Sequence, residues 1–139
     1  MKTAFIIIDV QNILVESGFE TEKLLEKIAY LQDQARKQQI EIIYIQHIET
    51  PEALTSEDWQ LSPLLKRQEN EKVFQKRYNS MFKETGLKEY LDQQGIQQLV
   101  LCGMQTEYCV DTSVKVGFEY GYKLVIPEGA VTTFDGEDI

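Results

Sequence analysis

The sequence has few of the residues that build metal centres or disulfide frameworks. Its 139 residues include one histidine and two cysteines. A disulfide framework needs more cysteines and a secreted context, and a zinc site needs more closely grouped cysteine and histidine ligands. Cys102 and Cys109 are therefore predicted to be free thiols, and no metal or other cofactor is expected.

Positive charge and long apolar runs are also scarce. Lys and Arg number 14 against 23 Asp and Glu, which gives a net charge of −9. Such a surface repels phosphate backbones and anionic membranes, so we expect a small-molecule substrate rather than nucleic acid or a membrane. No apolar run approaches the roughly 20 residues that span a bilayer. The start, MKTAFIIIDVQN, lacks a small-residue cleavage site and is interrupted by Asp9, so it is interpreted as a strand of a cytoplasmic protein rather than a signal peptide.

Apolar periodicity predicts alternating strands and helices. The run over residues 3–10 is continuously apolar, which is typical of a strand buried on both faces. Leu24, Ile28 and Leu31 recur at helical spacing, and Thr21 is placed to cap that helix. The predicted strands cover residues 3–10, 41–47, 72–76, 96–103 and 122–127, and the predicted helices cover 21–38, 86–95 and 107–120. This alternation predicts an α/β fold, a three-layer α/β/α sandwich with a parallel, Rossmann-like sheet of five or six strands.

Two regions depart from this alternation. Residues 48–71 are polar and irregular, and they are interpreted as a long excursion. The tail after residue 127 has no closing helix, so one face of the sheet is expected to be thinly covered. In the last predicted helix, one face is expected to carry Val110, Val114, Gly117 and Phe118.

Reactive side chains follow the ends of the predicted strands, where parallel sheets bind their ligands. Asp9, His47 and Lys76 end the first three strands, and Cys109 opens the helix after the fourth. A thiol at a helix N-terminus beside a lysine is expected to have a lowered pKa. Its thiolate would attack an electrophilic carbon, and Asp9 would take the thiol proton and return it to a leaving amine. These residue types together indicate covalent hydrolysis.

Three segments of the chain resemble a known superfamily. They are IIIDVQN around Asp9, KRYNSMFKETGL around Lys76, and GMQTEYCVDTSVKVGFEYGYKLVIPEGAVTTFD around Cys109. Together they are similar to the isochorismatase-like cysteine hydrolases, which include nicotinamidases and N-carbamoylsarcosine amidohydrolases. The similarity runs from residue 4 to residue 135.

The resemblance implies a fold and a set of site residues. Asp9, Lys76 and Cys109 would form the catalytic triad. The Met104–Gln105 peptide bond would be cis, and the N–H groups of Gln105 and Cys109 would form the oxyanion hole. The first and fourth strands would lie side by side. The family also tends to assemble, so a homodimer or homotetramer is expected.

The sequence departs from the family pattern at two places. Nicotinamidases bind a metal through Asp-x-His and a further His, whereas His47 is the only histidine here; this argues against both a metal and nicotinamide as substrate. The family usually continues past the GAVTTFD segment, so the single domain at 1–139 is expected to lack a C-terminal helix and strand. Isochorismatase itself cleaves a vinyl ether without the cysteine, so Cys109 favours C–N bonds.

The sequence therefore predicts a cysteine hydrolase that cleaves the C–N bond of a small amide or related compound through a thioester. Its pocket walls are expected to come from Gln11, Trp59, Gln105 and Tyr108. The alternatives are a non-catalytic or redox-sensing thiol module on the same fold, and a partner-binding scaffold. His47 is expected to be a hydrogen-bonded residue at a strand end rather than a catalyst, and Cys102 a core thiol.

Overall fold

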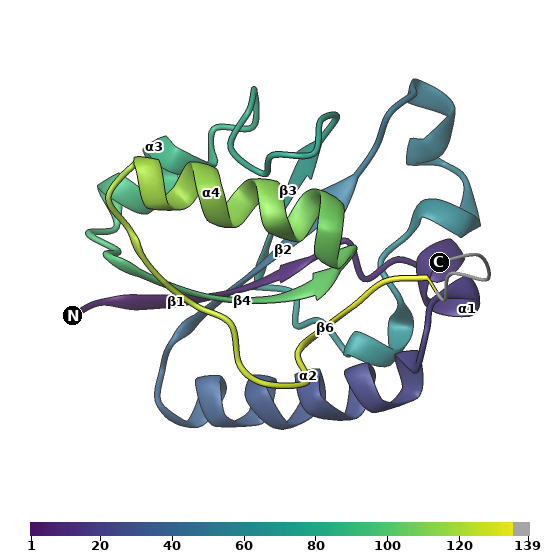
Figure 1. Cartoon of the computed structure of the whole chain (residues 1–139), viewed down its shortest axis with the longest axis horizontal. Helices are drawn as coiled ribbons and strands as arrows, with labels where there is room; N and C mark the ends of the chain where they lie inside the picture. Colours follow the sequence, from purple (N-terminus) through teal and green to yellow (C-terminus); the bar gives the residue numbers. More distant parts are fainter. Residues whose placement is uncertain (135–139) are drawn as a thin grey trace.

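The computed structural model describes residues 1–134, and its centre is a six-stranded parallel sheet (Figure 1). Its order is β3-β2-β1-β4-β5, and β6 pairs with the end of β4. The predicted sandwich is confirmed, and β1 and β4 are neighbours as the family resemblance implies. The strands are β1 (Thr3–Ile8), β2 (Glu41–His47), β3 (Lys72–Lys76), β4 (Gln98–Met104), β5 (Lys123–Val125) and β6 (Val131–Thr132).

Helices cover both faces of this sheet. Figure 1 shows α3 and α4 on one face and the long α2 on the other. The helices are α1 (Asn12–Ser17), α2 (Thr21–Lys37), α3 (Leu87–Gln93) and α4 (Asp111–Glu119). The sequence did not predict α1, because six residues are too few to display a helical period.

Alternate residues of each central strand enter different cores. Ile6 and Ile8 of β1 pack in the cluster that includes Leu87 and Leu91 of α3. Phe5 and Ile7 pack in the cluster that includes Leu24 and Ile28 of α2. Because side chains point alternately to the two faces of a strand, a strand covered on both faces must be apolar throughout. This accounts for the continuous apolar run at the start of the chain.

Two local predictions about the helices were wrong. Thr21 is the first helical residue of α2 and not its cap; its hydroxyl donates to the Val15 carbonyl at 2.8 Å. Phe118 is 73% exposed rather than buried. The buried stripe of α4 passes through Ser113 and Gly117, and the absent side chain of Gly117 lets Leu124 and Phe82 approach the helix closely.

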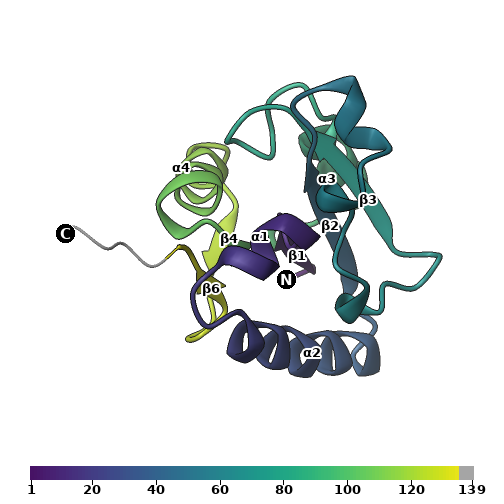
Figure 2. The same cartoon turned by 90° about the vertical axis from the view of Figure 1, so that its right-hand side faces the viewer.

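The excursion over 48–71 runs past the carboxyl ends of the strands. It contains three short 3-10 helices, Pro51–Leu54, Glu57–Trp59 and Pro63–Leu65. A bridge between Gln11 and Leu61 joins it to the chain just after β1. Figure 2 views this edge of the sheet, with α1 in front of the strands. None of the helices within residues 1–134 has both the length and the apolar content needed to span a bilayer.

Candidate active site

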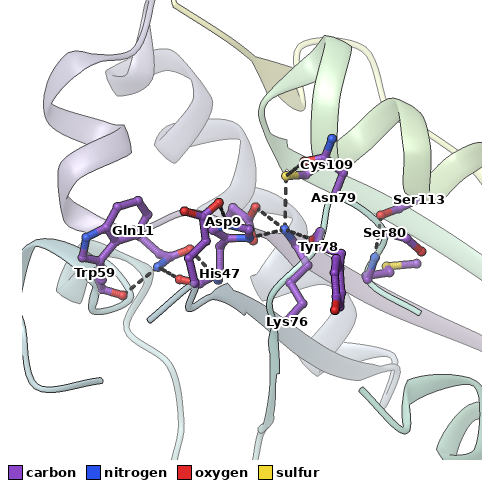
Figure 3. A network of polar contacts seen from close by, with 12 residues as sticks. Asp9, Gln11, His47, Trp59, Lys76, Tyr78, Asn79, Ser80, Cys109 and Ser113 are labelled. Carbon is purple, nitrogen blue, oxygen red and sulfur yellow. Dashed lines mark hydrogen bonds and ion pairs between the residues drawn. The ribbon is translucent and has the colours of Figure 1, made fainter. Parts of the chain in front are cut away.

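A buried lysine lies at the centre of the polar network at the strand ends (Figure 3). The side chain of Lys76 has no exposed surface. Its Nζ lies 2.9 Å from Asp9 Oδ2, 3.1 Å from Cys109 Sγ, 2.8 Å from His47 Nδ1 and 3.0 Å from the Tyr78 carbonyl oxygen. The structure therefore brings together the three residues predicted as a triad, and it adds His47 to them.

Strand pairing explains how residues so far apart in sequence meet. The register of β2 and β3 places His47 directly opposite Lys76. On the other side of β2, β1 ends one residue before Asp9, whose N–H donates to the Ile45 carbonyl at 3.0 Å. Asp9 then leaves the strand in the left-handed region, with φ of 53°, a conformation that aspartate tolerates better than most residues.

Cys109 lies in a short helical segment just after β4. The Met104–Gln105 peptide bond is cis, as the resemblance implied. A π-helical segment, Thr106–Val110, then precedes α4, so the predicted single helix over 107–120 begins as a wider turn. The Gln105 carbonyl accepts from the N–H groups of Tyr108 and Val110. The N–H groups of Gln105 and Cys109 belong to this turn, and their role as an oxyanion hole stays a prediction.

Burial dominates the electrostatics of the site. It raises the pKa of Asp9, and the nearby charge of Lys76 together with hydrogen bonding to Cys109 and Lys76 partly offsets this rise. Burial and the negative charge of Asp9 raise the pKa of Cys109 to about 11, against the opposing effect of Lys76. The sequence-based expectation of a lowered thiol pKa was therefore wrong. Cys109 is a thiol at neutral pH and needs a base, and Asp9 Oδ1 is buried without a hydrogen-bond partner.

A pocket of about 200 Å³ opens above this network. Trp59, Gln105 and Tyr108 line it, and their contact with substrate stays a prediction. The full lining is Asp9, Leu14, His47, Glu49, Trp59, Asn79, Gln105, Tyr108 and Cys109.

Gln11 lies behind the pocket instead of in its wall. Its side chain has no exposed surface. The amide nitrogen donates to the carbonyls of Trp59 and His47 at 2.7 and 3.0 Å, and the amide oxygen accepts from the His47 N–H at 2.8 Å. These hydrogen bonds of Gln11 therefore link the segment over residues 48–71 to the end of β2 and hold the Trp59 backbone in place.

Three lining residues were missed by the sequence reasoning. Asn79 lies within the segment that carries the family resemblance, and its Oδ1 is 3.8 Å from Cys109 Sγ. Glu49 follows β2 by two residues and pairs with His47, so its position after a strand end was an available signal. Leu14 comes from α1, the helix that the sequence did not reveal.

One cluster among the described residues has the donor types of a metal site. Ligand atoms of Asp9, His47 and Cys109 lie within 4.8 Å of one another. The ammonium of Lys76 contacts all three at 2.8 to 3.1 Å. A cationic group of the protein therefore occupies the centre of the donor set, and the residues present do not fit a metal ion well.

Comparison with known proteins identifies the family. The model of the isochorismatase domain matches residues 3–138. The chain belongs to the isochorismatase family. The family expected from the sequence is confirmed, and so is its enzyme class, an isochorismatase-family hydrolase.

Individual relatives of this isochorismatase-family chain share its fold at modest identity. It is 28% identical over 138 residues to streptothricin hydrolase of Streptomyces noursei. This match covers 95% of this chain but only half of that protein's length. It is also 28% identical over 142 residues to the uncharacterized family protein YddQ of Bacillus subtilis (strain 168), covering 96% and 79% of the two chains. The crystal structure of an isochorismatase from Pseudomonas putida KT2440 matches with a TM-score of 0.89 at 30% identity, covering 98% and 74%.

Proposed function

We propose that this chain is a metal-free cysteine hydrolase that cleaves the C–N bond of a small amide or related compound. The observation that carries the proposal is the shared contact of Lys76 Nζ with the carboxylate of Asp9 and the sulfur of Cys109. Nucleophile, base and cation thus meet at the floor of one pocket. A volume of about 200 Å³ lies below the usual range for drug-sized ligands, which favours a small substrate.

Acylation would begin when Cys109 Sγ attacks the carbonyl carbon while its proton passes to Asp9. The raised pKa of Asp9 suits it to accept this proton. The carbonyl oxygen becomes an oxyanion, and the N–H groups of Gln105 and Cys109 would donate to it. The intermediate then collapses, the C–N bond breaks, and the amine leaves with the proton that Asp9 held.

Deacylation would return the enzyme to its starting state. A water molecule attacks the thioester carbon and gives a proton to Asp9. The C–S bond breaks, a carboxylic acid is released, and the proton returns from Asp9 to the sulfur. Throughout the cycle the Lys76 ammonium offsets negative charge as it moves between Asp9 and Cys109.

The main alternative is a redox-sensing thiol on the same fold. Sensor cysteines are thiolates at neutral pH and are open to solvent. Cys109 is 9% exposed, and its pKa is raised to about 11. These properties favour a thiol that is activated by a base during turnover over one that reacts directly with peroxide.

A screen of small amides, ureides and lactams with ammonia detection tests the proposal, with Cys109→Ser as the inactive control. Incubation with an electrophilic amide mimic should give a one-to-one adduct on Cys109. A protein that forms no such adduct, hydrolyses none of these compounds, and instead oxidises stoichiometrically with peroxide would support the sensor. A cytoplasmic location and a homodimer or homotetramer remain predictions, for which fractionation and sedimentation are the measurements.

A further inference from the structure

The ammonium of Lys76 has more hydrogen-bond partners than hydrogens. A protonated lysine carries three N–H donors and has no acceptor. Four atoms lie within 3.1 Å of Nζ: Asp9 Oδ2, Cys109 Sγ, His47 Nδ1 and the Tyr78 carbonyl oxygen. Because the ammonium has three hydrogens, one of these four atoms receives no hydrogen bond from it at any moment.

The tautomer of His47 follows from its two neighbours. Its Nε2 lies 3.1 Å from Glu49 Oε1, and a carboxylate only accepts hydrogen bonds, so Nε2 carries the hydrogen. Nδ1 is then the acceptor for Lys76 Nζ at 2.8 Å. The neutral ring therefore accepts from the ammonium on one side and donates to Glu49 on the other.

Two of the four partners keep the same role throughout the reaction. The Tyr78 carbonyl can only accept hydrogen bonds. His47 Nδ1 remains an acceptor as long as the ring hydrogen stays on Nε2, which donates to Glu49. The other two, Asp9 and Cys109, exchange a proton and so change their strength as acceptors. A neutral thiol is a weak acceptor, whereas a thiolate is a strong one.

We propose that His47 is a positioning residue for the hydrolysis proposed above. Together with the Tyr78 carbonyl, it holds two N–H groups of Lys76, so that the third N–H alternates between Asp9 and Cys109. With Asp9 in its ion pair with Lys76 at 2.9 Å and the proton on the sulfur, the third N–H points to Asp9 Oδ2. When the S–H bond breaks and the proton binds Asp9 Oδ1, the sulfur becomes the anion and the N–H turns to Sγ.

This exchange leaves the total charge of the site unchanged. One S–H bond breaks, one O–H bond forms, and a single hydrogen bond changes partner. The titratable groups that line the pocket are Asp9, His47, Glu49, Tyr108 and Cys109, and Lys76 lies beneath them. The orphaned Oδ1 of Asp9 is the atom left free to take the proton.

Alkylation of Cys109 across a pH series tests the role of His47. His47→Asn keeps an acceptor near the Nδ1 position, whereas His47→Leu removes it. In His47→Leu the released N–H of Lys76 is free to donate to sulfur at rest, which stabilises the thiolate. Iodoacetamide labelling, followed on the Cys109 peptide by mass spectrometry, should then move to lower pH by about one unit, or roughly tenfold more thiolate at a given pH. His47→Asn should overlap the parent.

A His47→Leu profile that matches the parent, or that moves to higher pH, would overturn the proposal. Labelling of buried Cys102 reports whether this variant has unfolded. If His47→Leu has unfolded, the Glu49→Ala variant is used in its place. The Glu49 side chain is 70% exposed, so its removal should leave the fold intact. Without Glu49, the hydrogen of the His47 ring can move from Nε2 to Nδ1. A smaller shift in the same direction is expected, and no shift would count against the proposal. Alkylation needs no amide substrate, so failure here leaves the amide screen as a separate test.

Discussion

Gly103 of β4 approaches the backbone of Ile8 in β1 so closely that a side chain cannot fit between them. A Cβ built on Gly103 would lie 2.0 Å from the Ile8 carbonyl oxygen, and the residue has φ of 124°. The contact lies one residue before Asp9 and one before the cis peptide bond at Met104. It sets the distance between the strand ends that carry the base and the nucleophile.

Gly103→Ala is expected to separate these two strand ends. The new Cβ would displace a backbone carbonyl, and overpacking of this kind costs about 1–3 kcal/mol or more. The positive φ adds strain, because residues other than glycine rarely adopt it. We expect a lower midpoint of urea unfolding and a loss of activity larger than the loss of folded protein. Gly129→Ala is the matched control, because Gly129 also has positive φ (77°) but nothing within 4 Å of its Cβ position. Equal effects of the two substitutions would contradict the role given to Gly103.

Asp9→Asn is expected to reduce turnover by about 10²- to 10⁴-fold, because an amide cannot accept the thiol proton. An amide has nearly the same volume as a carboxylate, but this substitution also leaves the buried ammonium of Lys76 without its carboxylate. Removing one partner of a buried pair costs about 3–5 kcal/mol.

A double variant separates the two effects of this substitution. Asp9→Asn combined with Lys76→Met removes both buried charges, so the free energy of unfolding should recover while turnover stays lost. Rates come from the substrate found in the amide screen, and stability comes from urea unfolding. A single variant that keeps more than about a tenth of the parent rate would exclude Asp9 as the base.

Iodoacetamide at neutral pH should label Cys109 and spare Cys102. Cys102 is fully buried within β4, and burial holds its pKa well above its ordinary value. Cys109 lines the pocket, and its labelling should rise with pH up to about 11, since its raised pKa keeps it protonated below that value. Peptide mass spectrometry gives the rate for each thiol. Faster modification of Cys102 in folded protein would refute the assignment of the nucleophile.

Metal removal should leave activity unchanged. Lys76 already supplies a cation to Asp9, His47 and Cys109, and a second histidine for a site like that of nicotinamidases is absent from the sequence. Dialysis against a chelator, elemental analysis and an assay with added zinc check this. Activity that is lost to the chelator and restored by zinc would show that the metal-free mechanism is wrong.

Glu71 should give the fold a pH-dependent stability far from the site. Its carboxylate accepts from Arg36 Nε and Nη2, both at 2.9 Å, and from the Tyr44 hydroxyl at 2.8 Å. Burial alone would raise its pKa, but hydrogen bonds from Arg36, Gln68 and Tyr44 outweigh burial and lower it. A lowered carboxyl pKa stabilises the folded state above the ordinary value of 4.5, and this contribution is lost as the pH falls through the lowered value.

Glu71→Gln should therefore lower the free energy of unfolding by about 1–3 kcal/mol at pH 7. The difference from the parent should shrink as the pH falls below the ordinary value of 4.5 and through the lowered pKa of Glu71, where the parent carboxylate also becomes protonated. Urea unfolding at both pH values measures it, and Glu69→Gln is the control because Glu69 is exposed. A difference that stays constant down to pH 3 would mean that the charge of Glu71 does not matter.

The sequence by itself determined the layers of this protein and the chemistry of its strand ends. Continuous apolar runs such as residues 3–10 predict strands that are buried on both faces. Segments of helical periodicity alternate with these runs along the chain, and this order predicts a parallel sheet with helices on both sides. Because parallel strands all end at one edge, Asp9, His47, Lys76 and Cys109 could be expected near one another before any distance was known. The family resemblance then implied that Asp9, Lys76 and Cys109 form the triad.

Only the tertiary structure decided how these residues act on one another. The register of β2 against β3 brings His47 to Lys76, and the depth of the pocket raises the thiol pKa that helix position alone would lower. Gln11 lies behind the pocket although the sequence predicted it in the pocket wall, and Phe118 is exposed although the sequence placed it on the packed face of its helix. Periodicity records which residues are apolar, whereas burial, register and hydrogen-bond competition depend on segments brought together from distant parts of the chain.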